Sequence, residues 1–293
     1  MFKKFKNHFI KVQKGRIFCK IGGSGKPLLL LHGYPQTHYM WYKIADKLAE
    51  NFKVIIPDLR GYGRSMTPRG DKAHINYSKR EMAKDMFQVM QKLKYKKFFL
   101  SGHDRGARVA HRLARDYKSS VLALSILDIC PTLDMYNSTN KDFATGYFHW
   151  FFLIQPYDFP EQLIKKNPKL WLRNCLKKWS GGFNFKNVEH HYLKYFEKTS
   201  HIHSSCEDYR AGATIDLDHD KKDLKKKLNI PIQVIWGKRG RIGKNFKPVQ
   251  IWKKYTTKKV YGKALDCSHF VAEEKPLKTL KEILKFFRSI QIN

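Results

Sequence analysis

The sequence has no long apolar run, few cysteines and few acidic residues. Its apolar stretches fall well short of the roughly 18 residues that a membrane-spanning helix needs, which argues against a transmembrane protein. The basic start at Met1–Lys6 is not followed by an apolar stretch, so we expect no secretory signal. The five cysteines are odd in number and lack metal-ligand spacing, which indicates reduced thiols in a cytoplasmic protein.

Asp and Glu number only 25 against 58 Lys and Arg, which gives a formal net charge of +33. Such an excess often indicates nucleic-acid binding. Here the basic residues form small clusters along the whole chain rather than one tail or stripe, which favours a solvated surface without a specific nucleic-acid or membrane partner. A non-catalytic binding protein linked to nucleic acid remains an alternative. A positive field also favours the approach of small anionic substrates.

Apolar runs alternate with helical stretches, a pattern typical of an α/β fold with a mostly parallel sheet flanked by helices. The expected strands are His8–Gln13, Arg16–Ile21, Pro27–Leu31, Lys53–Pro57, Lys97–Ser101, Val121–Asp128, Ile232–Trp236 and Lys258–Lys263. The expected helices are Trp41–Ala49, Ser78–Leu93, Ala107–Tyr117 and Lys275–Arg288.

The stretch between Asp128 and Ile230 differs from the rest of the chain. It is rich in aromatic residues and has helical patterns without clear strands. We therefore predict a core domain made of residues 1–132 and 229–293, with a helical cap domain of residues 133–228 inserted into it.

The segment Gly102-His103-Asp104-Arg105-Gly106 follows an apolar run and opens a helical stretch. Its spacing is that of the nucleophile elbow of α/β-hydrolases, with Asp in place of the usual serine. A carboxylate is already charged at pH 7, so it can displace a leaving group from a saturated carbon and form an ester on its own side chain. The motif predicts a hydrolase that alkylates itself at Asp104. An Asp that only caps a helix is the structural alternative.

In this fold the acid and the histidine follow the nucleophile along the chain. Asp128 ends a predicted strand and His269 follows the last one, so an Asp128–His269 pair is expected to activate water, with Asp134 as a rival acid. The backbone N–H groups of Tyr34, after another strand, and of Arg105 are expected to form the oxyanion hole.

Arg105 and Arg108 indicate the substrate. Arg108 lies four residues after Asp104, on the same helical face, and Arg105 borders the elbow. Two guanidinium groups beside a nucleophilic carboxylate are suited to bind a substrate carboxylate through paired hydrogen bonds. The alternative is that both arginines pair with acids of the cap or core.

These residues together resemble the fluoroacetate (haloacetate) dehalogenases of the α/β-hydrolase fold over nearly the whole chain. The resemblance rests on the strings His32–Thr37, Gly102–Val109, Leu127–Ile129, Tyr147–Trp150 and Cys206–Gly212. It implies that His149, Trp150 and Tyr209 bind the departing halide, that Trp179 lines the pocket, and that the protein is a homodimer. The implied reaction converts a small anionic haloacid to glycolate and halide without a metal or organic cofactor.

Two features depart from the family pattern. Tyr34 stands where a phenylalanine is usual, and the segment Gly237–Lys244 is unusually basic. Both leave the preferred halide open. His201, His203 and Cys206 could suggest a metal, but we do not expect one.

An epoxide hydrolase is the nearest alternative function, because it would use the same Asp nucleophile. It would also need two cap tyrosines to protonate the epoxide oxygen. The candidates are Tyr147, Tyr157, Tyr192 and Tyr195.

Overall fold

The computed structural model describes residues 1–290, and its centre is one eight-stranded sheet with the order β1-β2-β4-β3-β5-β6-β7-β8. The strands are β1 (Phe5–Val12), β2 (Gly15–Gly22), β3 (Pro27–Leu31), β4 (Lys53–Pro57), β5 (Phe98–His103), β6 (Val121–Leu127), β7 (Ile232–Gly237) and β8 (Val260–Leu265). The pairings of β2 with β1 and β4 are antiparallel, and all others are parallel. The predicted α/β fold class is confirmed, and every expected strand is present.

Helices account for most of the remaining chain. The α-helices are α1 (Ala45–Leu48), α2 (Lys79–Lys92), α3 (Asp104–Asp116), α4 (Thr132–Asn137), α5 (Lys141–Gly146), α6 (Phe148–Leu153), α7 (Phe159–Lys166), α8 (Pro168–Trp179), α9 (Glu189–Phe196), α10 (Thr199–Ala213), α11 (Ile215–Lys222), α12 (Arg241–Asn245), α13 (Pro248–Lys253), α14 (Val271–Glu274) and α15 (Pro276–Arg288). Two short 3₁₀-helices, η1 (His38–Trp41) and η2 (Ile75–Tyr77), complete the set.

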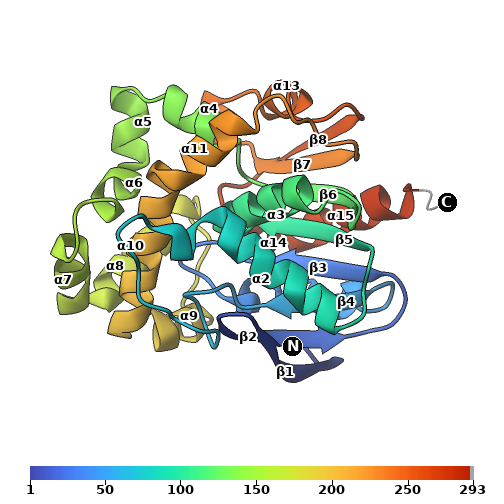
Figure 1. The fold of residues 1–293 in the computed structure, drawn as a ribbon, viewed down its shortest axis with the longest axis horizontal. Helices are drawn as coiled ribbons and strands as arrows, with labels where there is room; N and C mark the ends of the chain where they lie inside the picture. Colours follow the sequence, from blue (N-terminus) through green and yellow to red (C-terminus); the bar gives the residue numbers. More distant parts are fainter. Residues whose placement is uncertain (291–293) are drawn as a thin grey trace.

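The sheet separates two apolar cores because successive side chains of a strand point to opposite faces. In β3, Leu29 and Leu31 belong to the core beneath α2 and α3, whereas Leu28 and Leu30 belong to the core beneath α1 and α15. Figure 1 shows these helices in layers on either side of the sheet. A strand buried on both faces explains the continuous leucine run.

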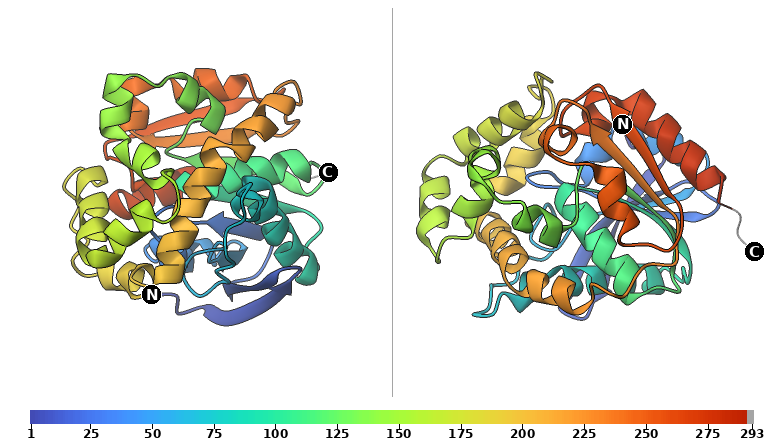
Figure 2. Two further views of the ribbon diagram at one scale, coloured as in Figure 1. Left: turned by 60° about the vertical axis from the view of Figure 1, so that its left-hand side comes forward. Right: turned by 90° about the horizontal axis from the view of Figure 1, so that it is seen from above.

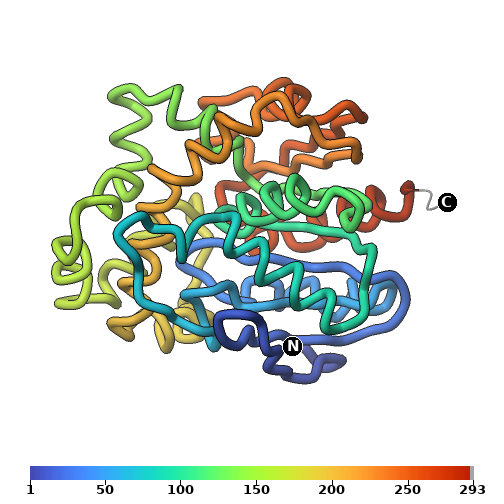
Figure 3. The backbone as a smooth tube through the Cα atoms, in the orientation of Figure 1, coloured from blue at the N-terminus to red at the C-terminus, as the bar shows by residue number. Residues whose placement is uncertain are grey.

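The chain between β6 and β7 forms the helices α4 to α11 and no named strand within the described residues. Helices α5 to α10 lie together at one end of the sheet, opposite the end where the C-terminal helix finishes (Figures 1 and 3). Helix α10 runs along the boundary between these helices and the sheet in both views of Figure 2. The assignment of residues 133–228 to a cap domain stays a prediction.

The expected helix at Trp41–Ala49 is interrupted. Trp41 is the last residue of η1, which Thr37 caps by accepting a hydrogen bond from the Tyr39 N–H, and α1 starts only at Ala45. Met40, Trp41 and Ile44 are all buried, so packing rather than helical propensity decides the backbone here. Within residues 1–290, no helix is both long and apolar enough to cross a bilayer.

Candidate active site

Asp104 occupies a tight turn between β5 and α3. Its φ is 46°, in the left-handed region that is costly for a residue with a side chain. The turn is possible because glycines flank it: a Cβ at Gly102 would lie 2.6 Å from the Gly106 carbonyl oxygen, and a Cβ at Gly106 would lie 2.3 Å from the His32 carbonyl oxygen. The side chain therefore lies at the N-terminus of α3, where the helix dipole favours a carboxylate.

The structure brings Asp104, Asp128 and His269 together. The Nδ1 of His269 lies 2.7 Å from Oδ2 of Asp128, and Oδ1 of Asp128 accepts a 2.9 Å hydrogen bond from the Gly237 N–H. The Nε2 of His269 faces Asp104 at 3.9 Å from Oδ2. An Nδ1–H donated to Asp128 leaves the lone pair on Nε2, which is the tautomer that can take a proton from water.

The rival acid Asp134 lies elsewhere. Its carboxylate accepts a hydrogen bond from the Tyr255 hydroxyl and lies 3.6 Å from Nζ of Lys254. Asp128, rather than Asp134, is therefore the acid in contact with His269.

The backbone N–H of Tyr34 donates a 3.0 Å hydrogen bond to Oδ1 of Asp104. This oxygen would become the carbonyl oxygen of an ester on Asp104, so the donor is already aimed at the position where negative charge would develop during hydrolysis. The Tyr34 ring is fully buried, and its hydroxyl accepts a 2.6 Å hydrogen bond from the Trp171 indole N–H. Tyr34 departs from the family pattern by carrying a hydroxyl group, and this hydroxyl is therefore hydrogen-bonded within the protein.

Opposing effects set the charges of this site. Burial would raise the pKa of Asp104, but the nearby charges of His269, His103 and the two arginines lower it below its usual value. Burial would lower the pKa of His269, but its hydrogen bond to Asp128 and the charges of Asp128 and Asp104 raise it. The carboxylate is therefore held ionised beside a histidine of increased basicity.

This balance predicts the pH dependence of ester hydrolysis. Because the base must be neutral, the rate is expected to fall as the pH drops through a His269 pKa that lies above its ordinary value. Asp128→Asn removes the group that raises this pKa, so the midpoint should move to lower pH while the maximum rate decreases. The rate of hydrolysis of a preformed ester, followed across the neutral range in both proteins, provides the measurement. An unchanged midpoint in the variant would contradict the assignment.

A cavity of about 460 Å³ opens beside the nucleophile. Asp104, Asp128 and His269 line it together with three predicted pocket residues, His149, Trp179 and Tyr209. Trp150, Arg105 and Arg108 are buried and do not line it.

Two buried side-chain nitrogens of this cavity lack a protein partner among the described residues. The His149 Nδ1 and the Trp179 Nε1 are buried without a hydrogen bond. Burial lowers the pKa of His149 to about 3, so its ring is neutral and carries one N–H. Buried donors without partners are costly, which is the arrangement expected where a ligand supplies the acceptor.

The two predicted substrate-binding arginines differ in their surroundings. The guanidinium of Arg105 donates to the Asp208 carboxylate from Nε at 3.1 Å and from Nη2 at 2.8 Å. Lys79 also contacts Asp208 and lies 3.2 Å from Asp216, so this cluster contains two cations and two carboxylates. The charge of Arg105 is therefore compensated, as in the alternative in which it pairs with a cap acid.

Arg108 has only neutral partners in the described part of the chain. Its Nη1 donates to the Cys130 carbonyl at 3.2 Å and to Thr132 Oγ1 at 2.9 Å, and its Cζ lies 4.8 Å from the Trp150 ring centroid. Its Nε is buried without a partner. No carboxylate of the described residues forms an ion pair with Arg108, and the charge of Asp104 acts on it only from a longer distance. A buried guanidinium without an ion-pair partner is costly, so of the two arginines Arg108 has the stronger need for an added carboxylate.

Glu273 is a residue of this region that the sequence did not indicate. It is fully buried in α14 and accepts hydrogen bonds from the Tyr192 hydroxyl at 2.7 Å and from the Gln36 amide. It thus joins the segment after His269, the loop after β3 and helix α9. The sequence offered little sign of a role for Glu273, because 237 residues separate it from its partner Gln36. Gln36 itself belongs to the motif that contains Tyr34.

Burial raises the pKa of Glu273 to about 8, from an ordinary value of about 4.5. At low pH both folded and unfolded states bind this proton. As the pH rises from about 4.5 to 8, only the unfolded state releases it, so stability falls by roughly 5 kcal/mol as an upper limit. Glu273→Gln should remove the loss of stability that deprotonation of Glu273 in the unfolded state causes over this pH range. Glu197→Gln, at an exposed position, should not remove it. Chemical denaturation over this pH range measures the difference, and parallel profiles for Glu273→Gln and wild type would contradict it.

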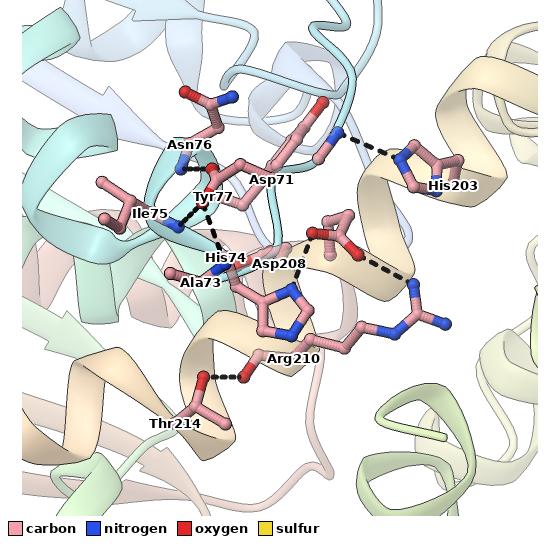
Figure 4. Close-up of polar contacts among 12 residues, drawn as sticks. Asp71, Ala73, His74, Ile75, Asn76, Tyr77, His203, Asp208, Arg210 and Thr214 are labelled. Atoms are coloured by element: carbon pink, nitrogen blue, oxygen red, sulfur yellow. Dashed lines mark hydrogen bonds and ion pairs between the residues drawn. The ribbon is translucent and has the colours of Figure 1, made fainter. Parts of the chain in front are cut away.

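Both histidines considered for a metal have other partners, and Nε2 of His201 lies 2.9 Å from the Gly63 carbonyl oxygen. His203 accepts a hydrogen bond from the Gly70 N–H at 3.1 Å through Nε2, and its Nδ1 lies 3.2 Å from the Glu161 carboxylate. Figure 4 shows the hydrogen bond between the His203 ring and the backbone of the loop that leads to His74. No group of three or more His, Cys, Asp or Glu suited to a metal occurs in residues 1–290.

Comparison with known proteins identifies the fold family. The family model described as alpha/beta hydrolase fold matches residues 26–276. The chain belongs to the α/β-hydrolase family. The crystal structure of an alpha/beta hydrolase from Nostoc sp PCC 7120 aligns with a TM-score of 0.97 at 49% identity, covering 99% of this chain and 100% of that one.

Two relatives of this α/β-hydrolase differ in their reactions. The chain is 39% identical to fluoroacetate dehalogenase from Burkholderia sp, over 98% of this chain and 95% of the relative. It is 34% identical to soluble epoxide hydrolase from Corynebacterium sp. (strain C12), over 97% of this chain and 98% of the relative. Both relatives support a hydrolase, and they leave two substrate classes to be distinguished.

Proposed function

We propose that the protein is a hydrolytic dehalogenase that converts haloacetates to glycolate and halide. Arg108, assisted by Arg105, binds the substrate carboxylate, which must pass beyond the residues that line the cavity to reach these two buried side chains. This contact aligns the α-carbon with Asp104. An oxygen of Asp104 bonds to this carbon as the carbon–halogen bond breaks, and the halide leaves with the bonding pair. His149 and Tyr209, which line the cavity, and the buried Trp150 supply the donors that stabilise the departing halide, and Trp179 lines the cavity beside His149 and Tyr209.

The second step restores the nucleophile. His269, oriented by Asp128, takes a proton from water, which adds to the carbonyl carbon of the Asp104 ester. The N–H groups of Tyr34 and Arg105 stabilise the oxyanion before glycolate departs. These steps balance without a metal or organic cofactor. The proposal includes a homodimer, which the family resemblance implies, and a cytoplasmic location, which the scattered cysteines favour.

The observation that carries the proposal is that Arg108 is buried without a carboxylate in hydrogen-bonding contact. A neutral epoxide offers no carboxylate to this buried guanidinium, whose hydrogen-bond partners are all neutral, whereas a haloacetate supplies one. The 39% identity to fluoroacetate dehalogenase supports the same substrate class.

Arg108→Leu is expected to weaken substrate binding without lowering the stability of the fold. The variant should raise the KM for chloroacetate by ~30-fold or more, because a charge-assisted contact to the substrate is lost. The melting temperature should stay the same or rise, because a buried unpaired charge is removed. Steady-state kinetics and thermal unfolding measure both effects, with the exposed Arg173→Gln as control. An arginine that only supports the fold would instead give lower stability with an unchanged KM.

Epoxide hydrolysis is the second candidate, and one observation favours it. Tyr147 and Tyr209 both line the cavity that contains Asp104. Of the other tyrosines considered for this role, Tyr157 is 63% exposed and Tyr192 donates its hydroxyl to Glu273. Two phenols near the nucleophile could protonate an epoxide oxygen.

A matched substrate panel distinguishes the two candidates. Wild type and Arg108→Leu are incubated with fluoroacetate, chloroacetate and styrene oxide, and halide, glycolate and diol are measured. Halide and glycolate from wild type, with a selective loss in the variant, are expected. Diol formation that is equal in both proteins, without halide, would reject the haloacetate proposal in favour of the epoxide hydrolase.

A further inference from the structure

The outer wall of the active-site cavity is strongly basic. Besides the residues around Asp104, the wall contains Lys178 at the end of α8, Arg239 after β7, and Arg241 and Lys244 in α12. Asp142, in α5, is the carboxylate of this outer part. We call Lys178, Arg239 and Lys244 the rim cations. They include two residues of the basic segment that the sequence singled out without assigning a role.

The charge of Arg241 is compensated by a nearby carboxylate more fully than the charges of the three rim cations. Nη1 of Arg241 lies 2.8 and 2.9 Å from the two oxygens of Asp142, and Asn245 donates to the same carboxylate at 2.7 Å. Arg239 pairs with Asp266 at 3.3 Å, but both side chains are more than half exposed, so this contact is weak.

The two lysines of the rim lack carboxylate partners. Within residues 1–290, neither Lys178 nor Lys244 forms an ion pair, and Lys178 lies over the Phe148 ring at 4.7 Å. A compensated arginine thus stands beside cations that remain available to an anion.

The rim is attached directly to the backbone beside His269. A Cβ at Gly240 would lie 3.3 Å from the Ser268 carbonyl carbon, and the Arg239 N–H donates to the Cys267 carbonyl at 2.9 Å. From the other side, the Trp179 carbonyl accepts a 3.1 Å hydrogen bond from the His269 N–H. Backbone contacts therefore hold the segments that carry the rim cations next to the reacting groups.

The cavity also exceeds the needs of a two-carbon haloacetate. Its volume of about 460 Å³ falls in the range of pockets that bind considerably larger ligands. The rim cations line the outer part of this cavity, whereas Arg105 and Arg108 are buried near Asp104, so the rim cations form a second source of positive charge.

We propose that Lys178, Arg239 and Lys244 form a second anion subsite, and that the cavity binds small dicarboxylates. One end of such a ligand lies at Asp104, and its distal carboxylate lies at the rim. The binding part of this proposal does not require any particular reaction.

The catalytic part rests on the proposed function. With 2-chlorosuccinate, an oxygen of Asp104 would bond to the chlorine-bearing carbon as chloride leaves with the bonding pair. Water would then add to the Asp104 ester carbonyl, which releases malate and one proton and restores Asp104. A 2-halo dicarboxylate is thus the substrate class that the second subsite adds.

Calorimetric titration of wild type with succinate and butyrate tests the subsite. The two ligands have the same carbon chain, but butyrate lacks the second carboxylate. At low salt we expect succinate to bind ~10-fold more tightly, which corresponds to a few exposed charge contacts acting together. The preference should disappear in Lys178→Gln/Lys244→Gln and persist in the control Lys92→Gln, which is exposed at the end of α2.

Equal affinity for the two ligands in wild type, or a preference that survives in the rim variant, would overturn the subsite. The calorimetric comparison of succinate with butyrate does not depend on any reaction of the protein. If succinate is preferred through the rim but chloroacetate is not hydrolysed, the subsite stands and the dehalogenase proposal fails. If chloroacetate is hydrolysed without any preference for succinate, the reverse holds.

Discussion

His269→Gln is expected to stop the reaction after one release of halide for each active site. Displacement of the halide needs only the ionised Asp104, which the site holds below its usual pKa. Hydrolysis of the resulting ester needs a base next to the attacking water, and glutamine cannot accept that proton. The hydrolytic step should therefore slow by ~10²–10⁴-fold, and the ester should accumulate.

Two measurements check this result. A rapid-mixing assay with chloroacetate should show a burst of one chloride per site, and the intact protein should gain the mass of one carboxymethyl group. Proteolysis should place this group on the peptide that contains Asp104. Continuous turnover without an adduct would mean that another base serves the site, since Nε2 of His269 is the nitrogen facing Asp104 at 3.9 Å.

Asp104→Asn is expected to reduce halide release by ~10⁴-fold or more, because a neutral amide is a far weaker nucleophile than a carboxylate. The fold should be unaffected. Asn has nearly the same shape as Asp and tolerates the left-handed backbone that residue 104 adopts.

Stability and activity are therefore measured on the same preparation of the Asp104→Asn protein. Lost activity with an unchanged melting temperature supports direct participation of the carboxylate. Substantial residual turnover by the intact variant would contradict a covalent mechanism at Asp104.

Local patterns predicted most of the fold. The sequence predicted each strand of the sheet, and β3 was clear because a strand buried on both faces is continuously hydrophobic. The order of nucleophile, acid and histidine also predicted the contact between Asp128 and His269, because each lies just beyond a strand. Such features depend on neighbouring residues and on the shared edge of a parallel sheet.

Features that depend on distant pairs were not predictable in the same way. The partner of Arg105 is Asp208, 103 residues later, and the partner of Gln36 is Glu273, 237 residues later. Nothing in the local sequence separates a compensated Arg105 from an uncompensated Arg108. The interruption between η1 and α1 likewise follows from tertiary packing of Met40, Trp41 and Ile44. Charge and burial had to be observed before the two arginines could be given different roles.

The central claim is that an oxygen of Asp104 passes into the product. A single turnover of chloroacetate, with enzyme in excess and in water enriched in the heavy oxygen isotope, tests it most directly. We expect glycolate whose hydroxyl oxygen is unlabelled and an Asp104 peptide that contains the heavy oxygen, because water attacks the ester carbonyl. Heavy oxygen in the hydroxyl of this first glycolate, with an unlabelled Asp104, would show direct attack of water on the substrate and would contradict the account.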